Sequence, residues 1–280
     1  MKQPAVNKLL LTFAAGLGII SILLAATGGN PYRRLQVDGR DVRLLLVGDR
    51  GPTVVFESGA GSSLETWVRI QPEVARFART ISYDRAGNGL SSRSPLPRDA
   101  RNVAAELHAN LQAARVPPPY VLVGHSLGGP YLRVFAAMYP GEVAGLVLVD
   151  PTQEALVDWA KARKPEVRNQ NRPYDEGDCA YTALDQARES KPPENVPVVL
   201  LSGLGPREIP GFVSEQQKAE LTKDQETLWP MKLKFHREWV EKLPKGRLVV
   251  TEKSGHGIPF EEPELVVTEV RRMVDQLQGP

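Results

Sequence analysis

Short apolar runs alternate along the chain with longer segments in which apolar residues recur every three or four positions. The short runs, bounded by turn residues, predict buried β-strands, and the longer spacing predicts helices. The strands predicted in this way are Val42–Val47, Thr53–Glu57, Thr80–Tyr83, Tyr120–Val123, Val143–Val149, Val198–Leu201 and Leu248–Thr251. The predicted helices are Leu64–Phe77, Asp99–Arg115, Leu127–Tyr139, Ser214–Leu243 and Pro263–Leu277. This alternation favours an α/β fold, with a mostly parallel central sheet and helices on both faces.

Two segments depart from this alternation. Residues 30–50 have the pattern of a β-hairpin that turns at Asp38-Gly39. Residues 151–196 are polar and rich in proline, with two predicted helices at Ala155–Arg163 and Ala180–Glu189. We therefore expect one domain over residues 30–280, with a small helical cap inserted at about residues 151–196.

The amino-terminal segment, residues 1–29, differs in character from the rest. Lys2 and Lys8 precede an uncharged, mostly apolar run from Leu9 to Thr27, followed by small residues. A basic stretch before an apolar stretch is typical of a secretory signal, and the run is also long enough to span a bilayer. The segment predicts either export to the periplasm or the extracellular space, or anchoring to a membrane through residues 9–27.

Charge and composition narrow the possible partners. The chain has 35 Lys and Arg against 33 Asp and Glu, a net charge of +2, without a long run of one sign. No nucleic-acid partner is therefore expected. One cysteine, Cys179, excludes an intrachain disulfide, and no Cys and His spacing typical of zinc is present. No cofactor motif occurs, so neither a cofactor nor a metal is expected, and nothing indicates an oligomeric state.

The segment Gly124-x-Ser126-x-Gly128 lies between a predicted strand and a predicted helix. A serine at such a junction sits on a sharp turn that presents its hydroxyl above the edge of the sheet. Side chains two residues away on either side would crowd the turn, so both positions favour glycine. The following helix directs its N-terminal amides at the site, which favours a developing anion. Ser126 is therefore the candidate nucleophile.

A serine hydroxyl needs a nearby base to become a useful nucleophile. His256 follows a predicted strand and is flanked by Gly255 and Gly257, which places it on a loop at the carboxyl edge of the sheet. His125 is next to Ser126 in sequence, but the turn should point it elsewhere, into packing. His108 and His236 fall within predicted helices and are expected to be structural or at the surface. His256 is the candidate general base.

These motifs resemble those of the α/β-hydrolase superfamily, in its serine esterase and lipase-like branch, over nearly all of the chain after the amino-terminal segment. The matching stretches are Glu57–Gly61, Tyr83–Ser91, Gly124–Gly129 and Ser254–His256. The family commonly has His-Gly after its third strand, where this chain has Ser58-Gly59. By resemblance, the oxyanion hole consists of the backbone amides of Ala60 and Leu127, which do not depend on that side chain. Such donors contribute roughly 3–4 kcal/mol each to transition-state stabilisation.

The acid that orients the histidine has two candidates. Most relatives place it shortly after the strand predicted at Val198–Leu201, where Glu208 is the only carboxylate. Some relatives use the end of the preceding strand, where Asp150 follows Val149. We favour Asp150 and keep Glu208 as the alternative, while by resemblance Asp84 is structural.

Together these residues predict a serine hydrolase that forms an acyl-enzyme, with a small-molecule carboxylic ester as the expected substrate. Amides, lactones or carbon–carbon bonds could be cleaved on the same triad. A non-catalytic binding protein of the same fold is the alternative from another class.

Overall fold

The structure is a computed structural model that describes residues 31–163, 176–191, 194–206 and 214–279. The predicted amino-terminal segment, residues 1–29, and the candidate acid Glu208 lie outside these residues. Within the described part of the chain, no helix has both the length and the apolar character needed to cross a membrane.

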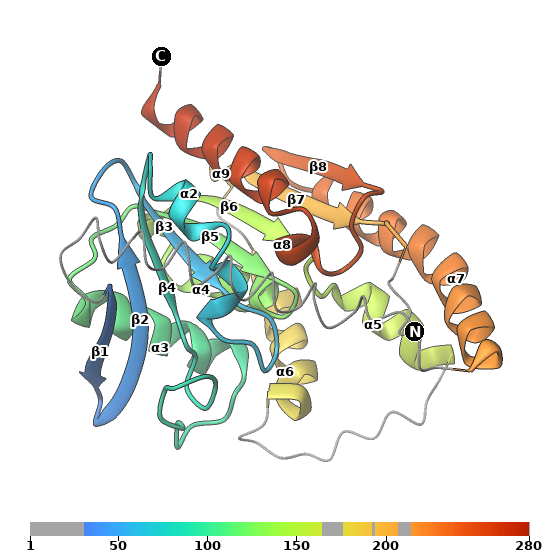
Figure 1. Ribbon diagram of the computed structural model, residues 1–280, viewed down its shortest axis with the longest axis horizontal. Helices are drawn as coiled ribbons and strands as arrows, with labels where there is room; N and C mark the ends of the chain where they lie inside the picture. The colour runs from blue at the N-terminus through green and yellow to red at the C-terminus, as the bar shows by residue number, and fades with distance from the viewer. Residues whose placement is uncertain (1–30, 164–175, 192–193, 207–213, 280) are drawn as a thin grey trace, which may run out of the picture.

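The described strands form one eight-stranded sheet in the order β1-β2-β4-β3-β5-β6-β7-β8 (Figure 1). β2 pairs antiparallel with β1 and β4, and the pairs from β4 to β8 are parallel. The strands are β1 (Tyr32–Val37), β2 (Arg40–Val47), β3 (Thr53–Glu57), β4 (Arg79–Tyr83), β5 (Tyr120–His125), β6 (Val143–Val149), β7 (Val198–Gly203) and β8 (Gly246–Thr251). The predicted mostly parallel α/β sheet is confirmed.

The hairpin predicted over residues 30–50 is also present. Asp38 and Gly39 connect β1 to β2, and both have positive φ, 49° and 74°. Such a pair of left-handed residues matches the right-handed twist of two antiparallel strands.

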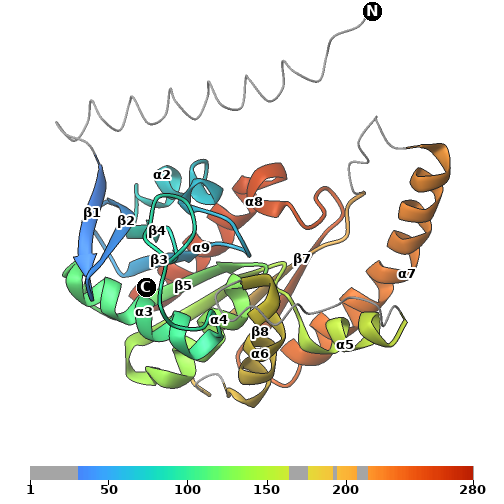
Figure 2. The same ribbon diagram turned by 90° about the horizontal axis from the view of Figure 1, so that it is seen from below.

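Helices cover both faces of the sheet (Figure 2). Successive residues of one strand point to opposite faces, so in β3 Val55 belongs to one core cluster while Val54 and Phe56 belong to the other. The cluster around Val55 is covered by α3 (Ala100–Ala113), α4 (Gly128–Met138) and α6 (Glu176–Glu189). The opposite cluster is covered by η1 (Leu64–Trp67), α2 (Gln71–Val74), α8 (Ile258–Glu261) and α9 (Pro263–Gln278).

The single helix predicted at Leu64–Phe77 is wrong, because this stretch forms η1 and α2 as two short helices. Pro72 lies in the first turn of α2, where a missing backbone N–H costs nothing. In a continuous helix the same proline would remove a hydrogen bond and clash with the preceding turn. The apolar spacing still serves burial, because Trp67, Ile70 and Val74 are all fully buried.

Both helices predicted within residues 151–196 are present. They are α5 (Glu154–Arg163) and α6, which begins at Glu176, four residues before the predicted start. The long helix predicted after β7 is α7 (Glu215–Val240), with Pro230 inside it. The boundaries of the cap stay a prediction, since residues 164–175 and 192–193 lie outside the described ranges.

Candidate active site

Ser126 occupies the turn between β5 and α4 with a φ of 55°, in the left-handed region that non-glycine residues rarely adopt. Its backbone N–H donates to Val149 O at 3.1 Å, which fixes the turn to the neighbouring strand β6. A Cβ on Gly128 would lie 2.5 Å from the backbone oxygen of Glu57, and one on Gly124 would lie 2.8 Å from that of Gly128. Close backbone approach therefore requires both glycines of the motif.

His256 lies on the loop that follows β8. Its Nε2 is 3.0 Å from Ser126 Oγ, within hydrogen-bond reach, and 57% of its side chain is exposed. A carboxylate holds the loop in place, because the hydroxyls of Thr251 and Ser254 both donate to Glu262, at 2.6 and 3.0 Å. The loop that carries His256 is thus held in place, while Nε2 of the imidazole faces Ser126 and solvent.

Asp150 closes β6, again with positive φ, 41°, and its Oδ2 is 2.7 Å from His256 Nδ1. Its Oδ1 accepts the Gly203 N–H at 2.9 Å, and Lys232 Nζ lies 2.9 and 3.0 Å from the two carboxylate oxygens. Burial alone would raise the pKa of Asp150, but the hydrogen bond from His256 and the charge of Lys232 outweigh it and lower the pKa to about 2. The carboxylate is therefore ionised at neutral pH.

The strand order explains why Ser126, Asp150 and His256, which are distant in sequence, lie close together. β5 and β6 are adjacent and in register at His125 and Val149, so the residues that follow them, Ser126 and Asp150, are neighbours at the carboxyl edge. β8 ends at the same edge and brings in His256. The structure thus brings together Ser126, His256 and Asp150.

The segment after β3 lies against Ser126. A Cβ on Gly59 would be 3.1 Å from the Cβ of Ser126, so the backbone that leads to Ala60 packs directly on the candidate nucleophile. Leu127 is the residue that caps the amino terminus of α4. Ala60 and Leu127 therefore lie on segments adjoining Ser126, and their role as oxyanion donors stays a prediction.

A buried ionic cluster of Glu57, Arg85 and Glu176 fixes the segment before Ala60. The Arg85 guanidinium donates to Ser58 O and Gly59 O, each at 2.5 Å, and to Glu57 Oε1 at 2.5 Å. It also donates to Glu176 at 2.7 and 2.8 Å. In the sequence, Arg85 stands out only as part of the Tyr83–Ser91 stretch, and the cluster cannot be predicted from it because Glu176 reaches Arg85 from α6, 91 residues further along the chain.

Glu176 also binds the other side of the same segment, where Gly61 N–H donates to its Oε2 at 2.9 Å. Burial would raise the pKa of Glu176, but Arg85 and the hydrogen bonds outweigh it and lower the pKa to about 2. For Glu57, which also accepts from the Tyr83 hydroxyl, burial prevails and raises the pKa. An ionised Glu176 therefore holds the predicted oxyanion segment to helix α6.

Asp84, expected to be structural, accepts the backbone N–H groups of Leu64 and Leu90 at 2.8 and 2.9 Å. It thereby ties the end of β4 to η1 and to the glycine-rich turn. The Arg43 guanidinium also donates to its Oδ2, at 3.3 Å, and together these contacts are those of a turn-bracing carboxylate.

The other histidines differ in part from expectation. His125, expected to point away from the site, donates from Nε2 to His256 O at 2.8 Å, and the two rings lie 4.9 Å apart. Burial lowers the pKa of His125 to about 4, so it is a neutral support for the histidine loop. His236 is fully buried, with Nδ1 2.9 Å from Ser202 Oγ, and His108 stacks on Tyr139 with ring centroids 3.9 Å apart.

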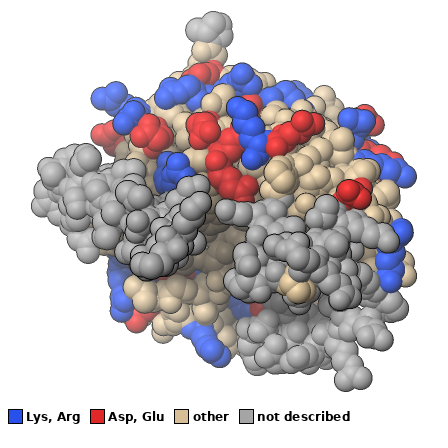
Figure 3. Space-filling view, turned by 45° about the vertical axis from the view of Figure 1, so that its right-hand side comes forward, with Lys and Arg blue, Asp and Glu red and all other residues tan. Residues whose placement is uncertain are grey.

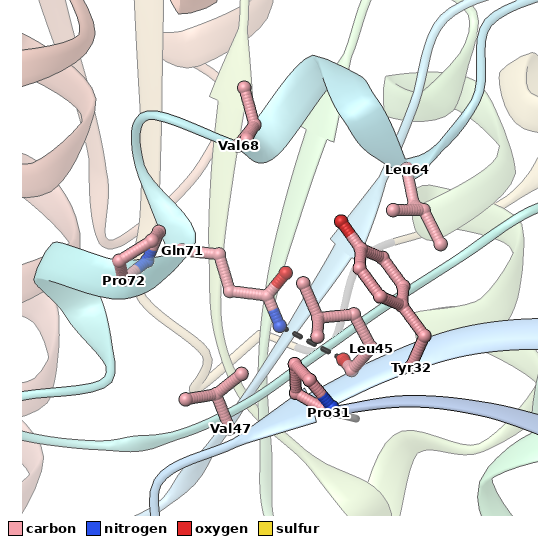
Figure 4. Close-up of a pocket in the computed structure, with 8 residues that line it drawn as sticks. All are labelled: Pro31, Tyr32, Leu45, Val47, Leu64, Val68, Gln71 and Pro72. Atoms are coloured by element: carbon pink, nitrogen blue, oxygen red, sulfur yellow. Dashed lines mark hydrogen bonds between the residues drawn. The ribbon is translucent and has the colours of Figure 1, made fainter. Parts of the chain in front are cut away.

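An apolar pocket lies apart from this centre, between the β1-β2 hairpin and the helices η1 and α2 (Figure 4). Two of the residues that line it are joined by a hydrogen bond, since Gln71 donates to Leu45 O at 2.9 Å. Its lining residues, none of which belongs to the candidate triad, are Pro31, Tyr32, Leu45, Val47, Leu64, Val68, Gln71 and Pro72. On the described part of the face in Figure 3, basic and acidic side chains are interspersed.

Comparison with known proteins agrees with this architecture. Residues 52–181 match the family model described as alpha/beta hydrolase fold. The chain is 40% identical over 113 residues to the uncharacterized protein YqjL of Bacillus subtilis, covering 40% of this chain and 44% of that protein. It is 33% identical over 106 residues to the (lyso)-N-acylphosphatidylethanolamine lipase of Mus musculus, covering 37% of this chain and 31% of the lipase. The matches thus span less than half the length of these two relatives.

Among solved structures, a thermophilic esterase from Thermogutta terrifontis superposes with a TM-score of 0.58 at 18% identity, covering 89% of this chain and 99% of the esterase. At that identity the similarity concerns the fold. The family model, the sheet topology and the solved structure agree that this chain has the α/β-hydrolase fold.

Proposed function

We propose that this protein is a serine hydrolase that cleaves carboxylic esters through an acyl-enzyme. The observation that carries the proposal is the continuous chain of hydrogen bonds from Asp150 Oδ2 to His256 Nδ1, 2.7 Å, and from His256 Nε2 to Ser126 Oγ, 3.0 Å. Nucleophile, base and orienting acid at hydrogen-bond distance define the acyl-transfer arrangement.

In the first half-reaction, His256 Nε2 takes the proton of Ser126 Oγ as the oxygen attacks the substrate carbonyl carbon. The developing oxyanion is held by the amides of Ala60 and Leu127, and Asp150 stabilises the imidazolium. His256 then returns the proton to the leaving alcohol, and an ester between Ser126 and the acyl group remains. In the second half-reaction, water gives a proton to His256 and attacks the acyl carbon. His256 then returns that proton to Ser126 Oγ as the bond between Ser126 and the acyl carbon breaks, which releases the acid and restores the free enzyme.

Two observations support an ester as substrate. The relatives and neighbours whose names state an activity include a lipase from Mus musculus and an esterase from Thermogutta terrifontis. The Ser126 hydroxyl is also placed for carbonyl attack, whereas halide displacement on this fold uses a carboxylate at that position. Amides, lactones and carbon–carbon bonds remain the alternative substrates of the same triad, and a hydrolysis screen across these classes ranks them.

Labelling with a fluorophosphonate tests the nucleophile. Wild-type protein should become covalently labelled and Ser126→Ala should not. Ser190→Ala, which removes a hydroxyl that donates to Gln186 O near the end of α6, should label like wild type. Absence of labelling in folded wild-type protein would refute the enzyme assignment and leave a binding protein of this fold.

The acid is tested by a pair of isosteric substitutions. Asp150→Asn should lower kcat by about 10⁴-fold, because an amide favours the wrong histidine tautomer and cannot stabilise the imidazolium. Glu208→Gln should change kcat little. The reverse pattern would transfer the role to Glu208.

We also propose that the protein is exported or tethered by residues 9–27. Amino-terminal sequencing of the mature protein from the producing cell tests this. Cleavage near Gly28 supports a signal peptide, an intact terminus in the membrane fraction supports an anchor, and an intact terminus in the cytosolic fraction refutes both.

A further inference from the structure

The triad acid has a second ionic partner that lies outside the triad. Lys232 projects from α7, and its ammonium group lies 2.9 and 3.0 Å from the two oxygens of Asp150. The side chain of Lys232 is 6% exposed, and the ring of Trp229, one turn earlier on α7, lies 4.7 Å from Nζ. This ion pair is therefore shielded from solvent. In such a buried environment charges interact far more strongly than at the surface.

We propose that Lys232 is a positioning residue that orients the Asp150 carboxylate and, by its charge, sets the acid limit of catalysis by His256. The inference rests on the proposed function, since it assigns a role at the same site. Neutral His256 faces an Asp150–Lys232 pair without net charge. Protonating His256 then places a third charge beside that pair.

The effect of Lys232 on His256 follows from the signs of the charges around the imidazole. An ionised carboxylate alone stabilises an adjacent imidazolium, and a nearby ammonium opposes that stabilisation. Loss of the Lys232 charge should therefore favour the protonated form of His256 and reduce its availability as a base in a more acidic medium. The Asp150 carboxylate has two donors besides the histidine, Lys232 Nζ and the Gly203 N–H. These hydrogen bonds keep the carboxylate from turning away when His256 is neutral.

Other charged or titratable groups around His256 do not duplicate this role. His125 packs against the His256 ring, but burial lowers its pKa to about 4, so it is neutral over the working range. His236, beside Lys232 on α7, is likewise held neutral by burial, with a pKa of about 4. Two carboxylates of the described residues contact the backbone or hydroxyls of the His256 loop: Glu261 accepts the Gly255 N–H at 2.9 Å, and Glu262 accepts from Thr251 and Ser254. Among the described contacts of Asp150, Lys232 supplies the permanent positive charge.

The experiment compares Lys232→Met, which removes the charge but keeps the length, with Lys232→Arg, which keeps the charge. Lys234→Met is the matched control, since Lys234 lies on the same helix with 57% of its side chain exposed. The kcat/KM of each variant is measured against pH with p-nitrophenyl acetate, because its acid limb reports the base of the free enzyme. His256 is titrated in parallel by NMR of histidine-labelled protein.

For Lys232→Met we expect the acid limb and the NMR midpoint of His256 to move upward by about one pH unit. Below the limb, kcat/KM should then be about tenfold lower than in wild type, and at pH about 8 it should stay within about threefold. Lys232→Arg and Lys234→Met should keep the wild-type limb. Lys232→Gln carries the same expectation as Lys232→Met and replaces it if the methionine variant does not fold.

An equal loss of kcat/KM at every pH with an unmoved limb would overturn the proposal and make Lys232 a purely structural residue. A limb displaced by more than half a unit in Lys232→Arg would also overturn it, because there the charge is kept. If wild type neither labels nor hydrolyses, the proposed function fails, while the NMR midpoint still decides whether Lys232 sets the protonation of His256.

Discussion

The contact between Glu176 and the segment around Ala60 can be tested by Glu176→Gln. Every hydrogen bond that Glu176 makes in this cluster is accepted by a carboxylate oxygen: from Arg85 Nε and Nη2, from Asn88 Nδ2 and from Gly61 N–H. A glutamine has only one acceptor oxygen. In either orientation its NH₂ group meets a buried donor, the Arg85 guanidinium among them.

The magnitude follows from the burial of the cluster. Breaking a buried ion pair by removing one partner costs about 3–5 kcal/mol. Because Arg85 keeps Glu57 as a partner at 2.5 Å, we expect the lower end, a loss of about 3 kcal/mol in the free energy of unfolding. For a chain of this size that lowers Tm by about 6–12 °C. If Glu176 holds the amide of Ala60 in place, kcat should also fall about tenfold, part of the roughly 10²–10³ that a lost oxyanion donor costs.

Thermal unfolding and ester hydrolysis at saturating substrate measure both effects. Glu189→Gln is the matched control: Glu189 ends the same helix, is 70% exposed and pairs with Arg101 at 3.1 Å. Such an exposed pair contributes about 0.5 kcal/mol or less. A Glu176→Gln variant with the Tm and kcat of its control would refute the reasoning. A lowered Tm with unchanged kcat would keep the ionic cluster but remove its connection to the oxyanion segment.

Further predictions concern pH and backbone packing. Folding lowers the pKa of Asp150 from 3.8 and that of Glu176 from 4.5, both to about 2, so each carboxylate stabilises the folded state at neutral pH and loses that contribution as the pH falls from about 4.5 toward 2. We expect a level Tm between about pH 5 and 7 and a steep fall below, worth about 2–3 kcal/mol per carboxylate; a level Tm down to pH 3 would contradict this. Gly128→Ala places a Cβ 2.5 Å from Glu57 O, and should lower the free energy of unfolding by about 1–3 kcal/mol in urea titrations and reduce fluorophosphonate labelling. Gly141→Ala, whose Cβ would meet nothing within 4 Å, should do neither, and equal effects in both variants would refute the packing argument.

The sequence predicted much of the fold because the relevant signals are local. Alternating apolar runs located the strands and most of the helices, and the turn residues Asp38 and Gly39 located the hairpin. The break at Pro72 was missed because apolar spacing alone does not register where a helix must restart. The glycines around Ser126 likewise predicted the strained turn, since close approach of two backbone segments requires residues without a side chain.

What the sequence by itself determined, then, is the α/β framework, the bend that carries Ser126 and the loop that carries His256, because each depends on neighbouring residues. Only the tertiary structure placed Asp150 Oδ2 2.7 Å from that histidine, and only it brought Lys232 to the acid and Glu176 to Arg85. These partners are separated by 82 to 106 residues along the chain, and no local pattern encodes their meeting. The order of the strands and the packing of α6 and α7 decide it, because electrostatic contacts depend on distance in space rather than on position in the chain.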